Sequence, residues 1–379
     1  MNRHVLFCDS LAFWGGGEHW IVAVARALAA RGWRTTVAGR DGSELLRRAR
    51  AAGIETVAWP YHRDFDWATM SAAAGFLQRQ APDLVLVTTG RDIRTAGLAA
   101  RWRGLPVVWR MGLMPKDKWI HRLTCTWVIT RIIAPSEYVH RQIESLHWLQ
   151  GRTTVIPNGV PDITAPSLED VQAARTRLGV AADERIILYV GRLLPAKGVD
   201  VLVRAFGPPA AASPDVRLIM VGTGPEEETL HGLASESGIA DRITFAGFTD
   251  DPSDYFTACD LLVLPSRFET FGFVLLEAMA RAKPIVATRV GGVPEVTGDD
   301  SALLVGADDP NALSEAMSTL LRDHEMCRTL GRSGQQRMRA LFSESRMVDR
   351  VEELFLSVIT SGGASHGNAV PLESRSSAV

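Results

Sequence analysis

Residues 260–295 read DLLVLPSRFETFGFVLLEAMARAKPIVATRVGGVPE and predict a strand, a loop, a helix, a second strand and a glycine turn, in that order. The apolar run at 260–264 is typical of a buried parallel strand. Residues 269–272 turn the chain into an apolar helix, which Lys283-Pro284 ends before the next strand at 285–287. This strand–helix–strand order indicates a parallel α/β sheet.

Two carboxylates bracket the start of the predicted helix. Glu269 lies in the entry loop and Glu277 about a turn and a half into the helix, with seven residues between them. The first N–H groups of a helix are unpaired and its dipole is positive there, so an anion is favoured. A ligand that joins a sugar to phosphate fits this arrangement, with its anion near the residues Thr270, Phe271, Gly272, Phe273 and Val274.

The strand–helix rhythm occurs twice, on either side of a turn-rich segment at 156–162. We therefore expect an α/β fold of two Rossmann-like, doubly wound domains facing a central cleft, the first over 1–160 and the second over 161–343. A last helix is expected over about 344–360. Residues 361–379 are rich in Gly, Ser, Ala and Pro, which predicts a disordered tail.

Composition favours a globular cytoplasmic protein. The 379 residues are 46% hydrophobic and 22% charged, and four scattered cysteines favour a reducing compartment without a zinc site or disulfide framework. Residues 2–7 are too short for a signal peptide, and no apolar run reaches the length of a membrane span.

The net charge of −2 conceals an asymmetry. Residues 1–160 hold 21 Lys+Arg and 12 Asp+Glu, a balance of +9, whereas residues 161–379 hold 20 and 31, a balance of −11. A basic first half suits an anionic acceptor or the cytoplasmic face of a membrane. Arg-rich solvated helix faces explain the same count, so both interpretations stand. Nucleic acid is not an expected partner.

Several loops that follow predicted strands carry polar chemistry. Arg192 and Lys197 follow one strand in the second half, where two cations can neutralise a diphosphate and stabilise it as a leaving group. Gly191 and Gly222 permit tight turns against a ligand, and Phe248 can lie against a nucleotide base. The ordinary alternatives are solvated charges, plain turns and core packing.

The motif search excludes several other classes of site. The glycine loop at 15–17 follows the first strand and can admit a phosphate, but it is not GxGxxG, and no GxxxxGK[ST], HExxH or GxSxG occurs. The triplet Asp64-Phe65-Asp66 is the only DxD, in a predicted surface loop, and a structural role is favoured for it. We expect no metal and no cofactor beyond a co-substrate.

Taken together, four features resemble retaining nucleotide-sugar glycosyltransferases of family 4, which have the two-domain GT-B architecture. They are Arg192 with Lys197, Glu269 with Glu277, the GGGE loop at 15–18 and GGVPE at 291–295. The resemblance covers the chain to about residue 360 and is strongest over 186–306.

The resemblance implies roles for these residues. Arg192 and Lys197 match the cations that hold the donor diphosphate, Glu269 the carboxylate that contacts the transferred sugar, and Glu277 the carboxylate that grips the ribose. Gly15 and Gly16 match the loop that closes over the phosphates. The family transfers sugar without a bound metal, and its members build lipopolysaccharide, exopolysaccharide and glycolipids. The last helix resembles the segment that crosses back onto the N-terminal domain.

The sequence departs from the family at one point. Many members carry a histidine after the fifth strand, where this chain has Trp109-Arg110-Met111. Arg110 is therefore an acceptor-side candidate, or a structural arginine. Two alternative functions remain: a hydrolysing UDP-N-acetylglucosamine 2-epimerase, which needs further acid and base groups, and a catalytically silent sugar-nucleotide-binding protein.

Overall fold

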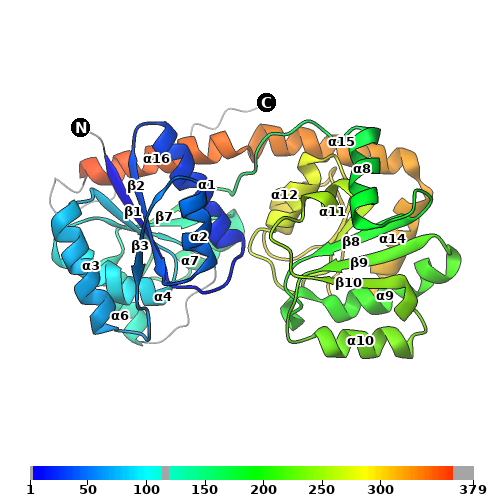
Figure 1. Ribbon diagram of the computed structural model, residues 1–379, viewed down its shortest axis with the longest axis horizontal. Coiled ribbons are helices and arrows are strands. Elements are labelled where there is room, and N and C mark those ends of the chain that lie inside the picture. The colour runs from blue at the N-terminus through cyan, green and yellow to red at the C-terminus, as the bar shows by residue number, and fades with distance from the viewer. Residues whose placement is uncertain (1–2, 113–118, 362–379) are drawn as a thin grey trace. The chain divides into compact units, whose positions relative to one another are not determined.

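The computed structural model describes residues 3–112 and 119–361. The chain divides into two compact units (Figure 1). Unit 1 comprises Met1–Ala134, His140–Ile156 and Val348–Val379, and unit 2 comprises Pro135–Val139 and Pro157–Met347. Each unit contains one fully parallel sheet with helices packed against it.

The sheet of unit 1 has seven strands in the order β3-β2-β1-β4-β5-β6-β7. The strands are β1 (His4–Asp9), β2 (Arg34–Arg40), β3 (Glu55–Trp59), β4 (Leu84–Val87), β5 (Val107–Arg110), β6 (Arg131–Ala134) and β7 (Thr153–Val155). The helices are α1 (Gly16–Ala30), α2 (Glu44–Ala51), α3 (Trp67–Gln80), α4 (Gly90–Asp92), the π-helix η1 (Ile93–Gly97), α5 (Leu98–Trp102), α6 (Trp119–Val128), α7 (Glu137–Glu144) and α16 (Glu344–Ser361).

The sheet of unit 2 has six strands in the order β10-β9-β8-β11-β12-β13. The strands are β8 (Arg185–Val190), β9 (Val216–Val221), β10 (Ile243–Gly247), β11 (Leu261–Leu264), β12 (Ile285–Thr288) and β13 (Leu303–Val305). The helices are α8 (Leu168–Leu178), η2 (Pro195–Lys197), α9 (Val199–Ala212), α10 (Glu227–Glu236), η3 (Ala240–Arg242), α11 (Ser253–Ala258), α12 (Phe273–Ala280), α13 (Val293–Thr297), α14 (Pro310–Arg322) and α15 (His324–Leu341).

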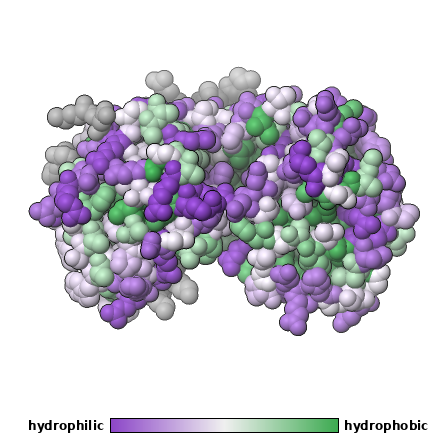
Figure 2. All heavy atoms as spheres, viewed as in Figure 1, coloured by the Kyte–Doolittle hydropathy of each residue, from purple (hydrophilic) through white to green (hydrophobic). Residues whose placement is uncertain are grey.

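Both faces of the sheet in unit 2 are buried, which explains its continuous apolar strands. Alternate residues of β8 enter opposite clusters: Ile187 packs with Phe206, and Leu188 with Leu276. On the face drawn in Figure 2, hydrophobic residues show between hydrophilic ones. A cavity of about 330 Å³ in unit 2 is lined by Ile219, Thr244 and Tyr255 among others. The expected doubly wound parallel sheets are confirmed.

Each sheet reverses its strand order once. In unit 1 the reversal lies between β1 and β4, and in unit 2 between β8 and β11. Ligands of open α/β sheets bind beyond the carboxyl ends of the strands at such a point. The loops after these four strands are therefore where each unit is expected to hold its ligand.

Some predicted boundaries were wrong. Helix α1 begins at Gly16, so Gly16 and Gly17 of the expected glycine loop lie in its first turn. Strands β7 and β13 and helices α8 and α11 were missed. Both strands are only three residues long and half-buried, so their apolar signal is short. The chain passes to unit 2 at Pro157 rather than at residue 161.

The last helix, α16, packs its second half into unit 1. Phe355 is fully buried and its ring lies 6.4 Å from that of Phe7 and 6.2 Å from that of Trp33. Glu352 accepts a 2.7 Å hydrogen bond from the indole N–H of Trp33 and one of the same length from Arg31. The tail expected beyond it lies outside the described residues, except for Ser361, which ends the helix.

Candidate active site

An ion pair lies at the point of strand reversal in unit 2. Lys197, from the turn after β8, places its Nζ 2.6 Å from Oε2 of Glu269, in the loop after β11. The two loops are also joined through their backbones, because the N–H groups of Arg267 and Phe268 both donate to the carbonyl of Ala196. Glu269 is buried and Lys197 half-buried. The pair therefore has a fixed place at the edge of the sheet.

Glycines allow the surrounding loops to cross at backbone contact distance. A Cβ atom at Gly222 would lie 2.0 Å from the carbonyl oxygen of Gly191, and one at Gly291 would lie 1.7 Å from that of Glu269. Gly222 has a φ of 133° and Gly291 a φ of 54°, values that side chains other than glycine rarely adopt. Gly292 N–H donates to the same Glu269 carbonyl. The backbone of Glu269 is thus fixed by the GGVPE turn.

The helix that follows Glu269 in the chain, α12, begins without a side-chain cap among the described residues. Its N-cap is Gly272, with a φ of 90°. A helix start without a side-chain cap favours an anion, and an anion at this position stays a prediction. Phe271 is different: its side chain is buried and its ring lies 5.8 Å from that of Phe342, so only its backbone can meet a ligand.

Glu277 follows on the fifth residue of α12. Burial raises the pKa of this carboxyl above its usual value, and the positive charge of Arg281 partly opposes the shift. The guanidinium of Arg281 is held nearby by a 3.0 Å hydrogen bond to the carbonyl of Glu277. A half-buried carboxyl of this kind suits hydrogen bonding to sugar hydroxyls.

The other residues predicted to bind the nucleotide-sugar donor follow the strands β8, β10 and β11 of unit 2. Arg192 is exposed directly after β8, and its carbonyl accepts a 2.8 Å hydrogen bond from the hydroxyl of Tyr189. Phe248 follows β10 and is exposed, so its ring is not part of the core. The carbonyl oxygen of Thr270 accepts a 2.8 Å hydrogen bond from the hydroxyl of Ser136.

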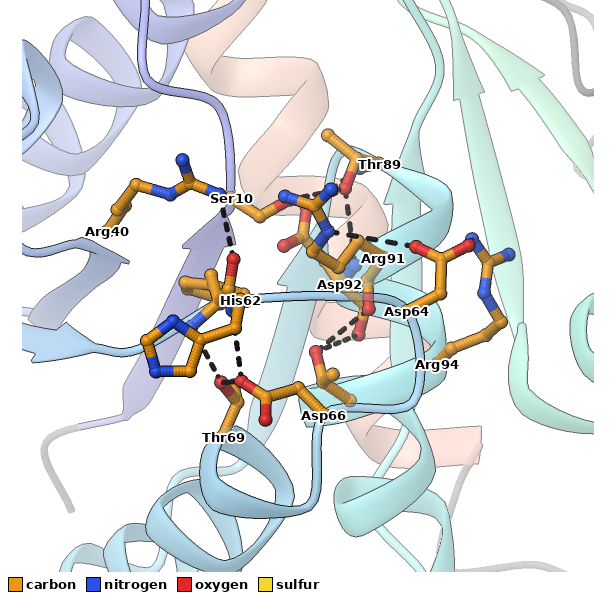
Figure 3. A network of polar contacts seen from close by, with 12 residues as sticks. Ser10, Arg40, His62, Asp64, Asp66, Thr69, Thr89, Arg91, Asp92 and Arg94 are labelled. Atoms are coloured by element: carbon orange, nitrogen blue, oxygen red, sulfur yellow. Dashed lines mark hydrogen bonds and ion pairs between the residues drawn. The ribbon is translucent and has the colours of Figure 1, made fainter.

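A second group of polar side chains gathers at the strand reversal of unit 1 (Figure 3). Asp9 ends β1, and its carboxylate accepts a 2.6 Å hydrogen bond from Thr88, which follows β4. Asp92 accepts hydrogen bonds from the backbone and the hydroxyl of Thr89, at 2.8 and 2.7 Å. The hydroxyls of Ser10 and Thr89 are 2.8 Å apart. Both carboxylates are buried.

The glycine turn at 15–17 is followed directly by a buried carboxyl, that of Glu18. Glu18 is buried in the first turn of α1, where burial raises the pKa of its carboxyl and hydrogen bonds from the backbone of Glu18 and Gly15 partly oppose the rise. A glutamate three residues after the N-cap is the capping-box position. Glu18 lies at this position, and binding of a ligand phosphate near Gly15 and Gly16 stays a prediction.

Arg110, at the end of β5, lies inside this group. Its side chain is buried and its Cζ is 5.2 Å from the centre of the Trp20 ring. A Cβ atom built on Gly17 would lie 3.3 Å from its Nη1. Burial lowers the pKa of Arg110 to about 10, while the charges of Glu18 and Asp9 oppose that change. Both the structural and the acceptor-side interpretation of Arg110 therefore stay predictions.

Three buried carboxyls, those of Asp9, Glu18 and Asp92, lie in this group, and the single charge of Arg110 does not offset the rise in their pKa values. Burial, together with the charge of Asp9, raises the pKa of Glu18 to about 7 and that of Asp92 to about 7. Burial also raises the pKa of Asp9. Near neutral pH this group therefore retains protons. Sequence analysis missed Asp9 and Asp92, although polar residues that follow apolar strands were a usable signal.

The DxD triplet has structural partners. Asp64 pairs with Arg94 at 2.5 Å, and Asp66 accepts hydrogen bonds from Thr69 at 2.6 Å and from the N–H of His62 at 3.1 Å (Figure 3). Within residues 3–112 and 119–361, no cluster of His, Cys, Asp and Glu has the arrangement of a metal site. The structural interpretation of this triplet agrees with these contacts.

Two family models together match most of the chain. Residues 14–162 match Glycosyltransferase Family 4, and residues 170–337 match Glycosyl transferases group 1. The chain belongs to the family 4 glycosyltransferases of the GT-B fold.

Relatives and solved structures agree with this family. The lipopolysaccharide core biosynthesis glycosyltransferase LpsE of Rhizobium meliloti is 26% identical over 348 residues, covering 90% of this chain and 96% of LpsE. The N-acetyl-alpha-D-glucosaminyl L-malate synthase of Bacillus anthracis is 31% identical over 191 residues, half of each chain. Apart from LpsE, the chain spans about half the length of the first curated relatives it matches. The structure of Anabaena Alr3699/HepE in complex with UDP and glucose superposes with a TM-score of 0.82 at 23% identity, covering 93% of this chain and 99% of that one.

Proposed function

We propose that this family 4 glycosyltransferase moves a sugar from a nucleoside-diphosphate sugar to an acceptor hydroxyl, with retention of anomeric configuration and without a metal. The observation that carries the proposal is the Lys197–Glu269 pair beside the uncapped start of α12, at the strand reversal of unit 2. The complexes of HepE with UDP and with UDP-glucose support a nucleotide-sugar donor.

In this proposal each of these side chains has a part. Lys197 and Arg192 bring positive charge to the diphosphate, and the first-turn N–H groups of α12 bind its oxygens. Glu277 binds the ribose hydroxyls, and Glu269 binds hydroxyls of the transferred sugar. Because Glu269 also holds Lys197, the cation that meets the phosphate is oriented before the donor arrives.

In the proposed transfer, no side chain of the protein forms a covalent bond to the sugar. The bond between the anomeric carbon and the phosphate oxygen breaks, and the acceptor oxygen bonds to the same face of that carbon. The departing diphosphate takes the proton of the acceptor hydroxyl. Negative charge builds on the diphosphate as the bond breaks, so Lys197, Arg192 and the helix start stabilise the transition state more than the bound donor.

The acceptor we propose is a sugar or lipid-linked sugar, reached at the cytoplasmic face of the membrane. The relation to LpsE supports a place in the synthesis of cell-surface polysaccharide or lipopolysaccharide. No helix in the described part of the chain is long and apolar enough to cross a membrane. Membrane contact would therefore involve the surface of the protein rather than a spanning helix of that part.

The test combines a donor screen with matched variants. UDP-, GDP- and ADP-sugars are assayed for transfer to lipid-linked sugar acceptors and for hydrolysis without an acceptor. Glu269→Ala should abolish transfer, whereas Glu325→Ala, which removes an exposed carboxylate paired with Arg328 on α15, should preserve it. Full transfer by Glu269→Ala would disprove the role of this carboxylate. Epimerisation or hydrolysis as the sole reaction, or binding of the donor without any reaction, would favour the alternative functions.

A further inference from the structure

Four large apolar side chains lie exposed on two neighbouring helices of unit 1. Trp119, Leu123 and Trp127 are spaced four residues apart along α6, so they share one face of that helix. They are 74, 61 and 45% exposed, and Trp102, at the end of the adjacent α5, is 62% exposed. We call these four residues the aromatic face. Single exposed apolar residues are common, but a row of this size marks a surface that meets another apolar phase.

Arginines surround one end of this face. Arg101 lies with its Cζ 5.7 Å from the centre of the Trp127 ring and donates to the Trp127 carbonyl at 3.0 Å. Arg152 donates to the carbonyls of Thr126 and Ile129, at 2.7 and 2.9 Å. These contacts fix positive charge to the last turn of α6, where the helix dipole is negative.

The positive charges are close enough to repel one another. The pKa of Arg152 is lowered by burial and by the charges of Arg131 and Arg101. In the sequence from 98 to 136 the only acidic residue is Asp117. The stretch that carries the aromatic face is therefore basic in composition, although Glu144 accepts hydrogen bonds from the N–H of Gly151 beside Arg152. An anionic surface would relieve the repulsion among these arginines.

We propose that the aromatic face docks onto an anionic phospholipid bilayer. Indole rings and leucine enter the interface between headgroups and acyl chains, and arginines bind the phosphates beside them. A second copy of the chain is the main competing occupant. A two-fold interface would bring the same face of each copy together and oppose arginine to arginine, which is unfavourable.

Docking explains how a protein without a described spanning helix can reach a lipid-linked acceptor. This consequence rests on the proposed function, but binding to the bilayer does not depend on catalysis. The two proposals can therefore fail separately: transfer to a water-soluble acceptor tests the chemistry, and vesicle binding tests the face.

The experiment is co-sedimentation of the full chain with two kinds of vesicle, pure phosphatidylcholine and phosphatidylcholine mixed with phosphatidylglycerol. Leu123→Glu combined with Trp127→Glu places two carboxylates on the face. Leu168→Glu is the matched control, because Leu168 is 84% exposed on α8 of unit 2. We expect the wild type and the control to bind the anionic vesicles. The double variant should bind them at least roughly tenfold more weakly than the wild type. About 0.5 M salt should weaken the wild type, since it screens the arginines.

A second variant separates lost binding from lost folding. Arg103→Glu reverses one exposed charge beside Trp102 and leaves every apolar side chain in place. It should also lower vesicle binding, and hydrolysis of the donor should stay unchanged in both variants. Equal vesicle binding by the wild type and the double variant would overturn the proposal. A dimer in sedimentation velocity that the double variant dissociates, without wild-type binding to vesicles, would assign the face to a second copy instead.

Discussion

Lys197 and Glu269 lie 72 residues apart in the sequence and are joined by an ion pair of 2.6 Å between Nζ and Oε2. The pair exists because β8 and β11 are neighbours at the strand reversal of unit 2. It places a cation and a carboxylate side by side next to the start of α12. This combination suits a sugar diphosphate, because the cation can bind the diphosphate and the carboxylate can bind hydroxyls of the sugar.

Lys197→Ala should lower kcat/KM for sugar transfer by about tenfold to a hundredfold. A hydrogen bond to a charged group is worth about 1.5–3 kcal/mol, and one factor of ten is about 1.4 kcal/mol. Steady-state kinetics with the preferred donor measures this change. Arg328→Ala, in an exposed pair on α15, is the control and should leave kcat/KM unchanged. Unchanged kinetics in both Lys197→Ala and Arg192→Ala would remove the diphosphate role.

Gly291→Ala should disturb the loop that carries Glu269. The added Cβ would lie 1.7 Å from the Glu269 carbonyl oxygen, and the φ of 54° is strained for alanine. The left-handed conformation alone costs about 1–2 kcal/mol, and the contact with backbone adds to it. Gly306→Ala is the matched control, because a Cβ at Gly306 would have no atom within 4 Å and its φ is not in the left-handed range. Urea unfolding should show a loss of about 2 kcal/mol or more for Gly291→Ala alone; equal stability of the two variants would contradict the close crossing.

The grouping of Glu269, Gly272 and Glu277 could be predicted because these residues lie on one short stretch, whereas the Lys197–Glu269 contact depends on which strands are neighbours. A strand end, a glycine turn and the two glutamates around one helix start all lie within a short stretch, so sequence spacing places them together. The network of Asp9, Thr88 and Asp92 could not be predicted in the same way. It forms because β1 and β4 are neighbours, and strand order is a tertiary property. Glu18 is an intermediate case: its spacing from Gly15 is that of a capping box, but its burial beside Arg110 is not visible in the sequence.

Glu18 should make the stability of the protein depend on pH. The folded-state pKa of about 7 lies above the ordinary value of 4.5, so the folded state holds more protons than the unfolded state between these pH values. The stabilising contribution is therefore present below about pH 4.5 and is lost as the pH rises through about 7. The full effect of one such group is at most about 3 kcal/mol.

Glu18→Gln should remove this dependence and keep the helix cap, because glutamine also serves at the capping-box position. Urea unfolding at pH 5 and pH 8 measures the effect. The variant should resemble the wild type at pH 5 and exceed it in free energy of unfolding at pH 8. Glu325→Gln, on the exposed surface of α15, should change neither value. A variant less stable than the wild type at pH 8 would show that the carboxylate stabilises the turn in its charged form.

Arg110→Met should destabilise the protein most strongly at high pH. Arg110 is the charge that opposes the raised pKa values of Glu18 and Asp9, and all three side chains are buried. Removing one partner of a buried ionic group costs about 3–5 kcal/mol, because the other charge is left uncompensated. At pH 5 the loss should be smaller, since protonated carboxyls no longer need the guanidinium.

Two further variants decide whether Arg110 is structural or contacts the acceptor. Combining Arg110→Met with Glu18→Gln should cost less than the sum of the single changes at pH 8, because the neutral glutamine has no charge to compensate. Arg110→Lys keeps a cation and should recover part of the stability. If Arg110→Met instead unfolds at the wild-type urea concentration and raises only the KM for the acceptor, the guanidinium binds substrate. In that case its burial in the structure does not represent the working state of the glycine turn.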